Sequence, residues 1–457
     1  MGKLPLEIID LVITELWRQR DAKGQSACSL VCRAWLQYAS DRKFSAIVFE
    51  GMTKGDNLCY TLLELIDGRP ALARSVRWVF FSEDPEDEED SDDDDDDDED
   101  EDDEDDELSS VFHEWLQPSL YIAPLLRKLT MLQGLWLNMT LNWATLQADL
   151  KSAFYDLFAR PTMQSICLRR ISDMDISPFV QYAHISELSL RAVSVVPSNN
   201  RGLSLNQHEM SPTAVASNLR KCDINATAAA AMDIILKAPN PKLNFRGVAR
   251  LEVSTDLWDD MTQSVWDRVT EQCVTTLTNL RIMHSVGGVD PSQASPFPFK
   301  ILDHLRFSSL STLVLHTKGY LIDNVAGHNI LPHFLKALRS LASVGNVLQR
   351  LEMQVGYEGE PYWKPCSPCA MQTINKTKDA WPYLFWTELD TVLVSPGFKM
   401  FKLFVLEYYT GWNNKDFPCD SLEQSLKELL PQLVKRDMLD GPHRFFFFLQ
   451  IVLSLFG

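Results

Sequence analysis

The chain has 457 residues, of which 45% are hydrophobic, and its formal net charge is −20 at pH 7. This length and hydrophobic content allow two or three ordinary domains or one elongated repeat array with a large core. Residues 83–107 hold 23 of the acidic residues, and the remaining 40 acidic and 43 basic residues nearly balance. Because no broad basic face is indicated, the charge does not support nucleic-acid binding.

Two short blocks in the first fifty residues are typical of amphipathic helices. The first begins at Leu4-Pro5, because a proline at the first helical position has no N–H hydrogen bond to lose. Its apolar residues recur at helical spacing, and the second block, residues 29–35, does the same after a serine that can cap a helix. Both blocks carry more apolar surface than fifty residues bury alone, which predicts a docking module.

The two blocks, Leu4-Pro-x-Glu7-Ile8 and Ser29-Leu-Val-Cys32-Arg33-x-Trp35, resemble the F-box, a small helical module, over residues 3–50. The resemblance implies docking on the SKP linker protein of cullin–RING ubiquitin ligases. The side chains that would face or support the linker are Leu4, Pro5, Ile8, Leu30, Val31, Cys32 and Trp35. The alternative is an ordinary helical hairpin that packs on the rest of the chain.

The pattern Leu-x-x-Leu-x-Leu, with conservative replacements, recurs through most of the chain at intervals of 22 to 41 residues. We expect each final Leu-x-Leu to form a short strand, with both leucines inside and the residue between them outside. The copies begin at Leu132, Met163, Ile185, Leu219, Val248, Leu277, Leu310 and Leu348, with a weaker copy at Leu389.

Helical periodicity lies between these strands, at residues 143–157, 228–237, 258–273 and 332–341. The alternation predicts an α/β chain that resembles an irregular leucine-rich-repeat solenoid, a horseshoe, over residues 130–410. A non-repetitive α/β domain is the alternative. In a solenoid the middle strand residues would face a ligand: Trp136, Cys167, Ser189, Asp223, Glu252, Arg281, Val314 and Glu352.

The acidic tract, Glu83–Glu107, lies between a predicted strand at 74–81 and a predicted helix at 111–116. We expect this tract to be a disordered loop insertion, because so many like charges repel one another. It could attract basic proteins or present Ser91 to acidophilic kinases, or it could be only a solvated loop.

No cofactor, metal or catalytic site is predicted. Cys366 and Cys369 form a lone CxxC without the further ligands that a structural zinc needs. The nine cysteines are scattered, as in a reduced intracellular protein, cytoplasmic or nuclear. The apolar run 445–456 is shorter than the roughly 20 residues of a membrane span, so neither a membrane nor a nucleic acid is expected as a partner.

The expected organisation is an F-box-like domain at 1–50, a first repeat or linker at 51–82, the acidic tract at 83–107, a solenoid at 108–430 and an apolar tail at 431–457. The expected function is substrate recognition for an SCF-type ubiquitin ligase in ubiquitin-dependent protein catabolism, with partners the SKP linker, the cullin complex and an unknown substrate protein. This chain would not be the enzyme. The alternative is a leucine-rich-repeat scaffold that binds basic proteins through its acidic tract.

Overall fold

The computed structural model describes residues 12, 27, 44–50, 55–82, 120–196, 218–238, 241–254, 260–285, 308–318, 330–344, 346–357, 381–410 and 427–440. The chain falls into two compact units. The N-terminal unit comprises Met1–Leu219 and Lys237–Leu243, and the C-terminal unit comprises Arg220–Leu236 and Asn244–Gly457.

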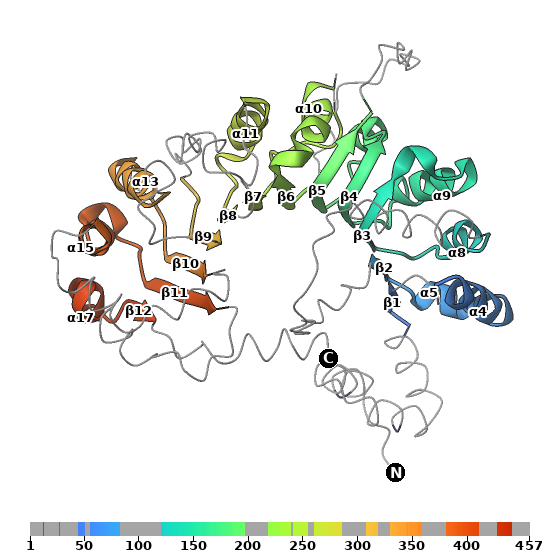
Figure 1. The fold of residues 1–457 in the computed structure, drawn as a ribbon, viewed down its shortest axis with the longest axis horizontal. Coiled ribbons are helices and arrows are strands. Elements are labelled where there is room, and N and C mark those ends of the chain that lie inside the picture. The colour runs from blue at the N-terminus through green and yellow to red at the C-terminus, as the bar shows by residue number, and fades with distance from the viewer. Residues whose placement is uncertain are drawn as a thin grey trace, which may run out of the picture. The chain divides into compact units, whose positions relative to one another are not determined.

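The described strands of the N-terminal unit run parallel, and each pairs with the next strand along the chain. Its helices all lie on one side of these strands (Figure 1). The elements are β1 (Ala46–Glu50), α4 (Gly55–Gly68), α5 (Pro70–Ser75), β2 (Trp78–Ser82), α8 (Ile122–Lys128), β3 (Gly134–Asn142), η1 (Trp143–Thr145), α9 (Ala148–Phe158), β4 (Ser165–Met174), η2 (Ser177–Gln181) and β5 (Glu187–Val195).

The C-terminal unit repeats this arrangement, with parallel strands in sequence order and helices on one side of them (Figure 1). Its elements are β6 (Lys221–Asn225), η3 (Ala226–Ala228), α10 (Ala229–Lys237), β7 (Arg250–Ser254), α11 (Asp260–Cys273), β8 (Asn279–Ser285), β9 (Thr312–Lys318), α13 (Ile330–Val344), β10 (Arg350–Tyr357), α15 (Trp381–Leu393), η4 (Pro396–Phe398), β11 (Leu403–Thr410), α17 (Pro431–Lys435) and β12 (Leu439–Asp440).

The prediction of an α/β chain is confirmed. The second apolar position of the predicted pattern occupies one register position on neighbouring strands, as in Leu135, Ile166 and Leu188. In the C-terminal unit the same position is held by Cys222, Leu251, Leu280, Leu313 and Leu351. All of these side chains are buried on the side that faces the helices, because alternate strand residues point to opposite faces.

A repeated hydrogen-bond pattern joins successive strands where each begins. The carbonyl of the residue just before one strand accepts two backbone N–H groups from the start of the next strand. Gln133, for example, accepts from Gln164 at 2.7 Å and from Ser165 at 2.9 Å. The other acceptors are Ser45, Arg77 and Gln164 in the N-terminal unit and Arg220, Ala249, Thr278, Ser311 and Gln349 in the C-terminal unit.

Two details of the sequence-based prediction are wrong. The copy at Leu389 is not a strand, since it lies largely in α15, and the actual strand is β11, where the pattern reads Phe401-x-x-Phe404-x-Leu406. The strand predicted at 74–81 starts only at Trp78, because Pro70 begins α5 immediately before it.

The predicted helices at 143–157, 228–237, 258–273 and 332–341 are confirmed with shifted ends. A short η1 turn replaces the first turn of one of them, because the Asn142 side chain accepts a hydrogen bond from the Ala144 N–H at 2.9 Å and starts a tight turn there. Lys237 ends α10, at the last residue of the range predicted for this helix. Helix and strand therefore alternate as the apolar spacing indicates.

A connected series of aromatic rings fills the core of the N-terminal unit. Phe81 of β2 stacks on Phe49 of β1 at 4.9 Å between ring centroids and meets Phe154 of α9 at 6.3 Å. Phe154 contacts Phe158 of the same helix, and Phe158 meets Phe179 of η2 at 5.3 Å. These five rings are fully buried, so they link β1, β2, α9 and η2 through one apolar layer.

Polar side chains tie neighbouring segments together in the C-terminal unit. The buried carboxylate of Asp390 in α15 accepts the backbone N–H groups of Gln432 and Leu433 at the start of α17, at 3.0 and 2.9 Å. The Asn346 amide donates to the carbonyls of Leu341 and Gly397. Each of these bonds satisfies a buried polar group.

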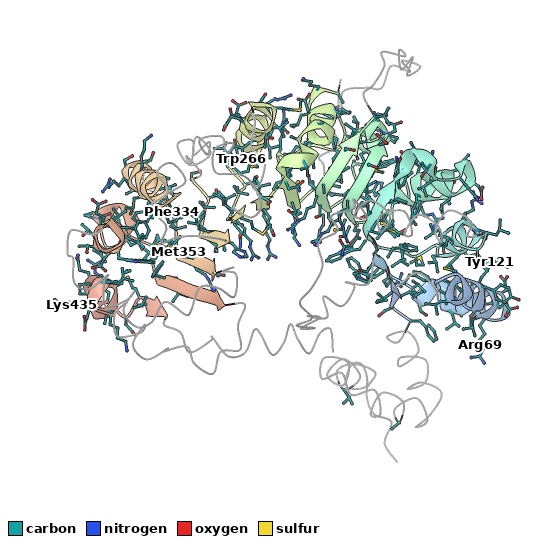
Figure 2. All side chains as sticks on the ribbon, in the orientation of Figure 1. Arg69, Tyr121, Trp266, Phe334, Met353 and Lys435 are labelled. Carbon is teal, nitrogen blue, oxygen red and sulfur yellow. The ribbon has the colours of Figure 1, made fainter. Side chains whose placement is uncertain are left out.

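Between the helices and the strands of the C-terminal unit lies an apolar layer (Figure 2). Phe334 of α13 and Met353 of β10 belong to this layer, as does Trp266 of α11, and all three are buried. Within the described residues, none of the helices combines the length and apolarity that crossing a bilayer requires.

The F-box-like blocks, the acidic tract, the CxxC at 366–369 and the apolar run at 445–456 lie outside the described residues, except that Val12 and Ala27 are helical. The predicted helix at 111–116 also lies outside them.

Candidate functional site

Each unit has one face of its strands on the side opposite its helices, which we call the open face (Figure 1). Strand alternation assigns side chains to the two faces. In β3, Leu135, Leu137 and Met139 are buried toward the helices, whereas Trp136 between them is 37% exposed. The open face is therefore the surface on which side chains of the strands can meet a partner.

The predicted middle positions form one row across each open face. Trp136, Cys167 and Ser189 are Cα partners on β3, β4 and β5. The five others are partners in the same way across β6 to β10: Asp223, Glu252, Arg281, Val314 and Glu352. Register thus brings together residues that are far apart in the sequence.

Three members of these rows are buried, although all members were predicted to face a ligand. Cys167, Asp223 and Val314 are only 2%, 5% and 8% exposed. Each lies between residues of adjacent strands, and the longer Arg169 side chain, on the same strand as Cys167, reaches across to Trp136. Alternation predicts which face a side chain takes, but its size relative to its neighbours decides how much solvent it meets.

An aromatic cluster occupies the open face of β2 and β3 in the N-terminal unit. Phe80 lies 6.4 Å from Trp78 and 5.3 Å from Trp136 between ring centroids. Trp78 lies against Gly134, where a Cβ atom would come within 2.1 Å of the indole ring. Glycine at this point therefore leaves room for the ring, and any larger residue would move Trp78 away from the backbone.

A guanidinium group completes this cluster. Cζ of Arg169 lies 5.7 Å from the centre of the Trp136 ring, which is cation–π distance. Nε of Arg169 is enclosed and has no hydrogen-bond partner among the described residues. The next strand carries Arg191 at the register position of Arg169. The cluster therefore joins exposed aromatic surface to positive charge.

The strands lose their regular geometry just beyond Arg169. Arg170, Asp173 and Ala192 adopt left-handed backbone conformations, with φ of 58°, 56° and 51°. The register between β4 and β5 shifts between Ile171 and Met174. These irregularities lie at the end of the aromatic cluster. Bulges redirect side chains and are common beside functional sites.

The open face of the C-terminal unit is charged rather than aromatic. Its first row contains Lys221, Arg250 and Arg350, and the next row contains Glu252 and Glu352. Arg350 pairs with Glu352 at 2.8 Å within one strand. Opposite charges in adjacent rows thus partly neutralise one another.

Four cysteines of the described residues are buried: Cys59, Cys167, Cys222 and Cys273. Burial raises the pKa of Cys222 well above its ordinary value and raises that of Cys273 to about 12. Since the thiolate is the reactive form, neither is poised as a nucleophile. The described residues also contain no group of three possible metal ligands.

The sequence patterns identified Trp136 but missed its partners Trp78, Phe80, Gly134 and Arg169. Trp78 and Phe80 belong to a copy of the repeat, Val76-x-x-Val79-x-Phe81, in which no leucine appears. Admitting phenylalanine as well as valine into the pattern would have found this copy.

No protein-family model matches the chain, and no match is found among curated proteins.

Proposed function

We propose that this chain is a non-catalytic substrate adaptor of an SCF-type ubiquitin ligase. The observation that carries the proposal is the pair of apolar blocks at 4–8 and 29–35, which resemble an F-box at the spacing that family uses. These blocks would dock on the SKP linker protein. The rest of the chain would hold a substrate protein.

The described strands support the substrate-holding part. Strands and helices that alternate, parallel pairing in sequence order and the repeated carbonyl acceptor are the features of a leucine-rich-repeat solenoid. In such an array the open strand face is a continuous surface for a partner protein. Ubiquitin transfer would take place on other subunits, and the adaptor would contribute proximity between enzyme and substrate.

The docking step is tested by co-purification of the full chain with the SKP linker. The double variant Leu30→Asp with Val31→Asp is expected to abolish the interaction, because carboxylates would be buried without partners against an apolar surface. The matched control is Lys23→Asp with Gln25→Asp, in the polar segment between the two blocks, which should retain the linker. Failure of the unaltered chain to retain the linker would contradict the proposal.

The acidic tract supports a second candidate function, a scaffold that captures basic proteins. With 23 acidic residues in 25 positions, this tract would attract cationic partners strongly at low salt. Replacing residues 83–107 by a Gly-Ser segment of equal length should remove histone binding in a pull-down, and raising the salt concentration should weaken it. Binding that survives the replacement would refute this second function.

A further inference from the structure

We propose that the open face of β2, β3 and β4 binds an extended peptide segment in which a large apolar side chain is followed, two residues later, by Asp or Glu. This inference deepens the substrate-holding part of the proposed function. It rests on an exposed aromatic surface, an arginine without an acid partner, and the distance between them along the strands.

The apolar half of the site is the row Val48, Phe80 and Trp136. These residues are Cα partners on β1, β2 and β3, so their side chains lie next to one another. Val48 is 43% and Trp136 37% exposed, although both are large apolar residues. Exposed aromatic side chains held in place by their neighbours are typical of the residues that dominate binding energy at protein interfaces.

The acidic half of the ligand would meet Arg169. Its guanidinium is held over Trp136, and it forms no ion pair or hydrogen bond with a described residue. Guanidinium groups remain charged at all ordinary pH values and bind carboxylates through paired hydrogen bonds. Arg191 on the neighbouring strand adds positive charge at the same register position. The complementary group is therefore a carboxylate.

The geometry sets the spacing in the ligand. Trp136 and Arg169 lie in adjacent rows, because the Cα partner of Trp136 is Cys167, two residues before Arg169. Two residues of a strand span about 6.6 Å, and the same distance separates successive side chains on one side of an extended peptide. A peptide that lies along the strands can thus place an apolar residue on Trp136 and an acidic residue at position +2 on Arg169.

The charges on this face favour a peptide over a single-stranded nucleic acid. Nucleic-acid grooves follow the phosphates with several cationic side chains. Here the row that begins the strands contains Trp78, Gly134, Ser165 and Glu187, and Glu187 is exposed and negative. Among the described residues of these rows, positive charge lies only at the end near Arg169.

The test is selection of a phage-displayed library of random dodecapeptides on the immobilised full chain. Enriched peptides are expected to contain Trp, Phe, Tyr or Leu with Asp or Glu two residues later. In fluorescence anisotropy with the enriched peptide, Trp136→Ser should weaken binding by roughly tenfold or more. Repeating the selection on Arg169→Glu should replace the acidic residue at this spacing with Lys or Arg, which a purely structural role for Arg169 would not produce.

Matched controls lie on the helical side of the same unit. Tyr60→Ser removes an exposed aromatic ring of α4, and Arg74→Glu reverses an exposed charge of α5. Both should leave the affinity and the selected sequence unchanged. If circular dichroism shows that Arg169→Glu does not fold, Arg169→Gln replaces it and should lose the acidic preference without gaining a basic one.

The proposal is overturned if the enriched peptides lack the apolar–x–acidic pair, or if Trp136→Ser and the Arg169 variant leave affinity and selected sequence unchanged. It is also overturned if an oligothymidine of twenty nucleotides binds and the same variants abolish that binding. All arms are repeated on the Leu30→Asp, Val31→Asp chain. Because this chain should not bind the linker, peptide selection and ligase docking can fail independently.

Discussion

The two units share one backbone plan but are held together by different side chains. In the N-terminal unit, aromatic rings from β1, β2, α9 and η2 form a continuous buried series. In the C-terminal unit, buried polar groups such as Asp390 and Asn346 bond to the backbone of a neighbouring segment. The same strand-start hydrogen bonds run through both units. The same backbone arrangement is therefore stabilised by aromatic packing in one unit and by buried side-chain hydrogen bonds in the other.

The open faces differ in the same way. Aromatic side chains and Arg169 mark the N-terminal unit, whereas the C-terminal unit presents rows of opposite charge, some of which are already paired. A surface with unsatisfied groups binds a partner more readily than one whose charges neutralise each other. The comparison therefore favours the N-terminal unit as the place of the peptide site that we propose.

The largest expected effect comes from breaking the aromatic series. Phe154 is fully buried and touches Phe81, Trp143 and Phe158. Phe154→Ala should destabilise the N-terminal unit by about 3–5 kcal/mol, because it removes a large side chain and leaves a cavity. Urea unfolding with amide hydrogen exchange measures this loss. A loss no greater than that of the exposed control Tyr60→Ala would show that the rings do not hold this unit together.

A smaller loss is expected when the polar link of the C-terminal unit is broken. Asp390→Ala leaves the N–H groups of Gln432 and Leu433 without their acceptor, which should cost about 1–3 kcal/mol. Amide exchange at Leu433 should accelerate, while exchange in the N-terminal unit stays unchanged. Asp390→Asn keeps one acceptor oxygen and should lose less. Equal exchange in all three proteins would mean that this link contributes nothing.

The C-terminal unit should also lose stability in alkali. Burial raises the pKa of the Cys273 thiol from 9.0 to about 12. Between these values the unfolded chain releases the proton and the folded chain keeps it, so stability is complete below pH 9 and falls as the pH rises. The slope for one such proton is at most about 1.4 kcal/mol per pH unit. Urea unfolding of Cys273→Ala from pH 8 to 10.5 should show a shallower decline than the unaltered chain. Parallel curves would contradict the assignment.

The smallest effect is expected from an ion pair on the surface of the N-terminal unit. Arg127 of α8 binds Asp149 of α9 at 2.6 Å, and its hydrogen bonds lower the pKa of that carboxyl. Both groups are exposed, so water and salt screen them. Arg127→Ala should leave the unfolding midpoint within experimental error.

Arg160 provides the contrast to that pair. It donates to the carbonyls of Leu126 and Leu129 and is partly buried, so Arg160→Ala should lower the midpoint measurably. If Arg127→Ala lowered the unfolding midpoint more than Arg160→Ala, the exposed ion pair would contribute more stability to the N-terminal unit than the partly buried hydrogen bonds of Arg160.

The sequence allowed the strands to be predicted wherever leucine or a close analogue fills the pattern. The pattern did not include β2, which was predicted only as a strand at 74–81. It failed at β11, where phenylalanine takes two of those places, and at Leu389, where helical residues match the pattern by chance. A short apolar run is compatible with either structure. Length and neighbouring segments decide between them only in the folded chain.

The candidate site was predictable only in part. Alternation identified Trp136 as a residue of the open face, but the position of Arg169 over its ring depends on the register between β3 and β4 and on a side chain that crosses between strands. The packing of the Trp78 ring against Gly134 likewise depends on the pairing of two strands. A single sequence does not specify such pairs.

The carbonyl ladder at the strand starts gives the chain a direction. Wherever two N–H groups share such a carbonyl among the described residues, the carbonyl precedes the earlier strand and the donors begin the later one. At the last pair the direction is reversed, because the Met438 carbonyl before β12 accepts from Phe404 of β11. As the chain leaves the ribosome, most of these acceptors are therefore already made when their donors emerge. Each new strand can pair with the one just completed, so folding within each unit can follow synthesis from its N-terminus.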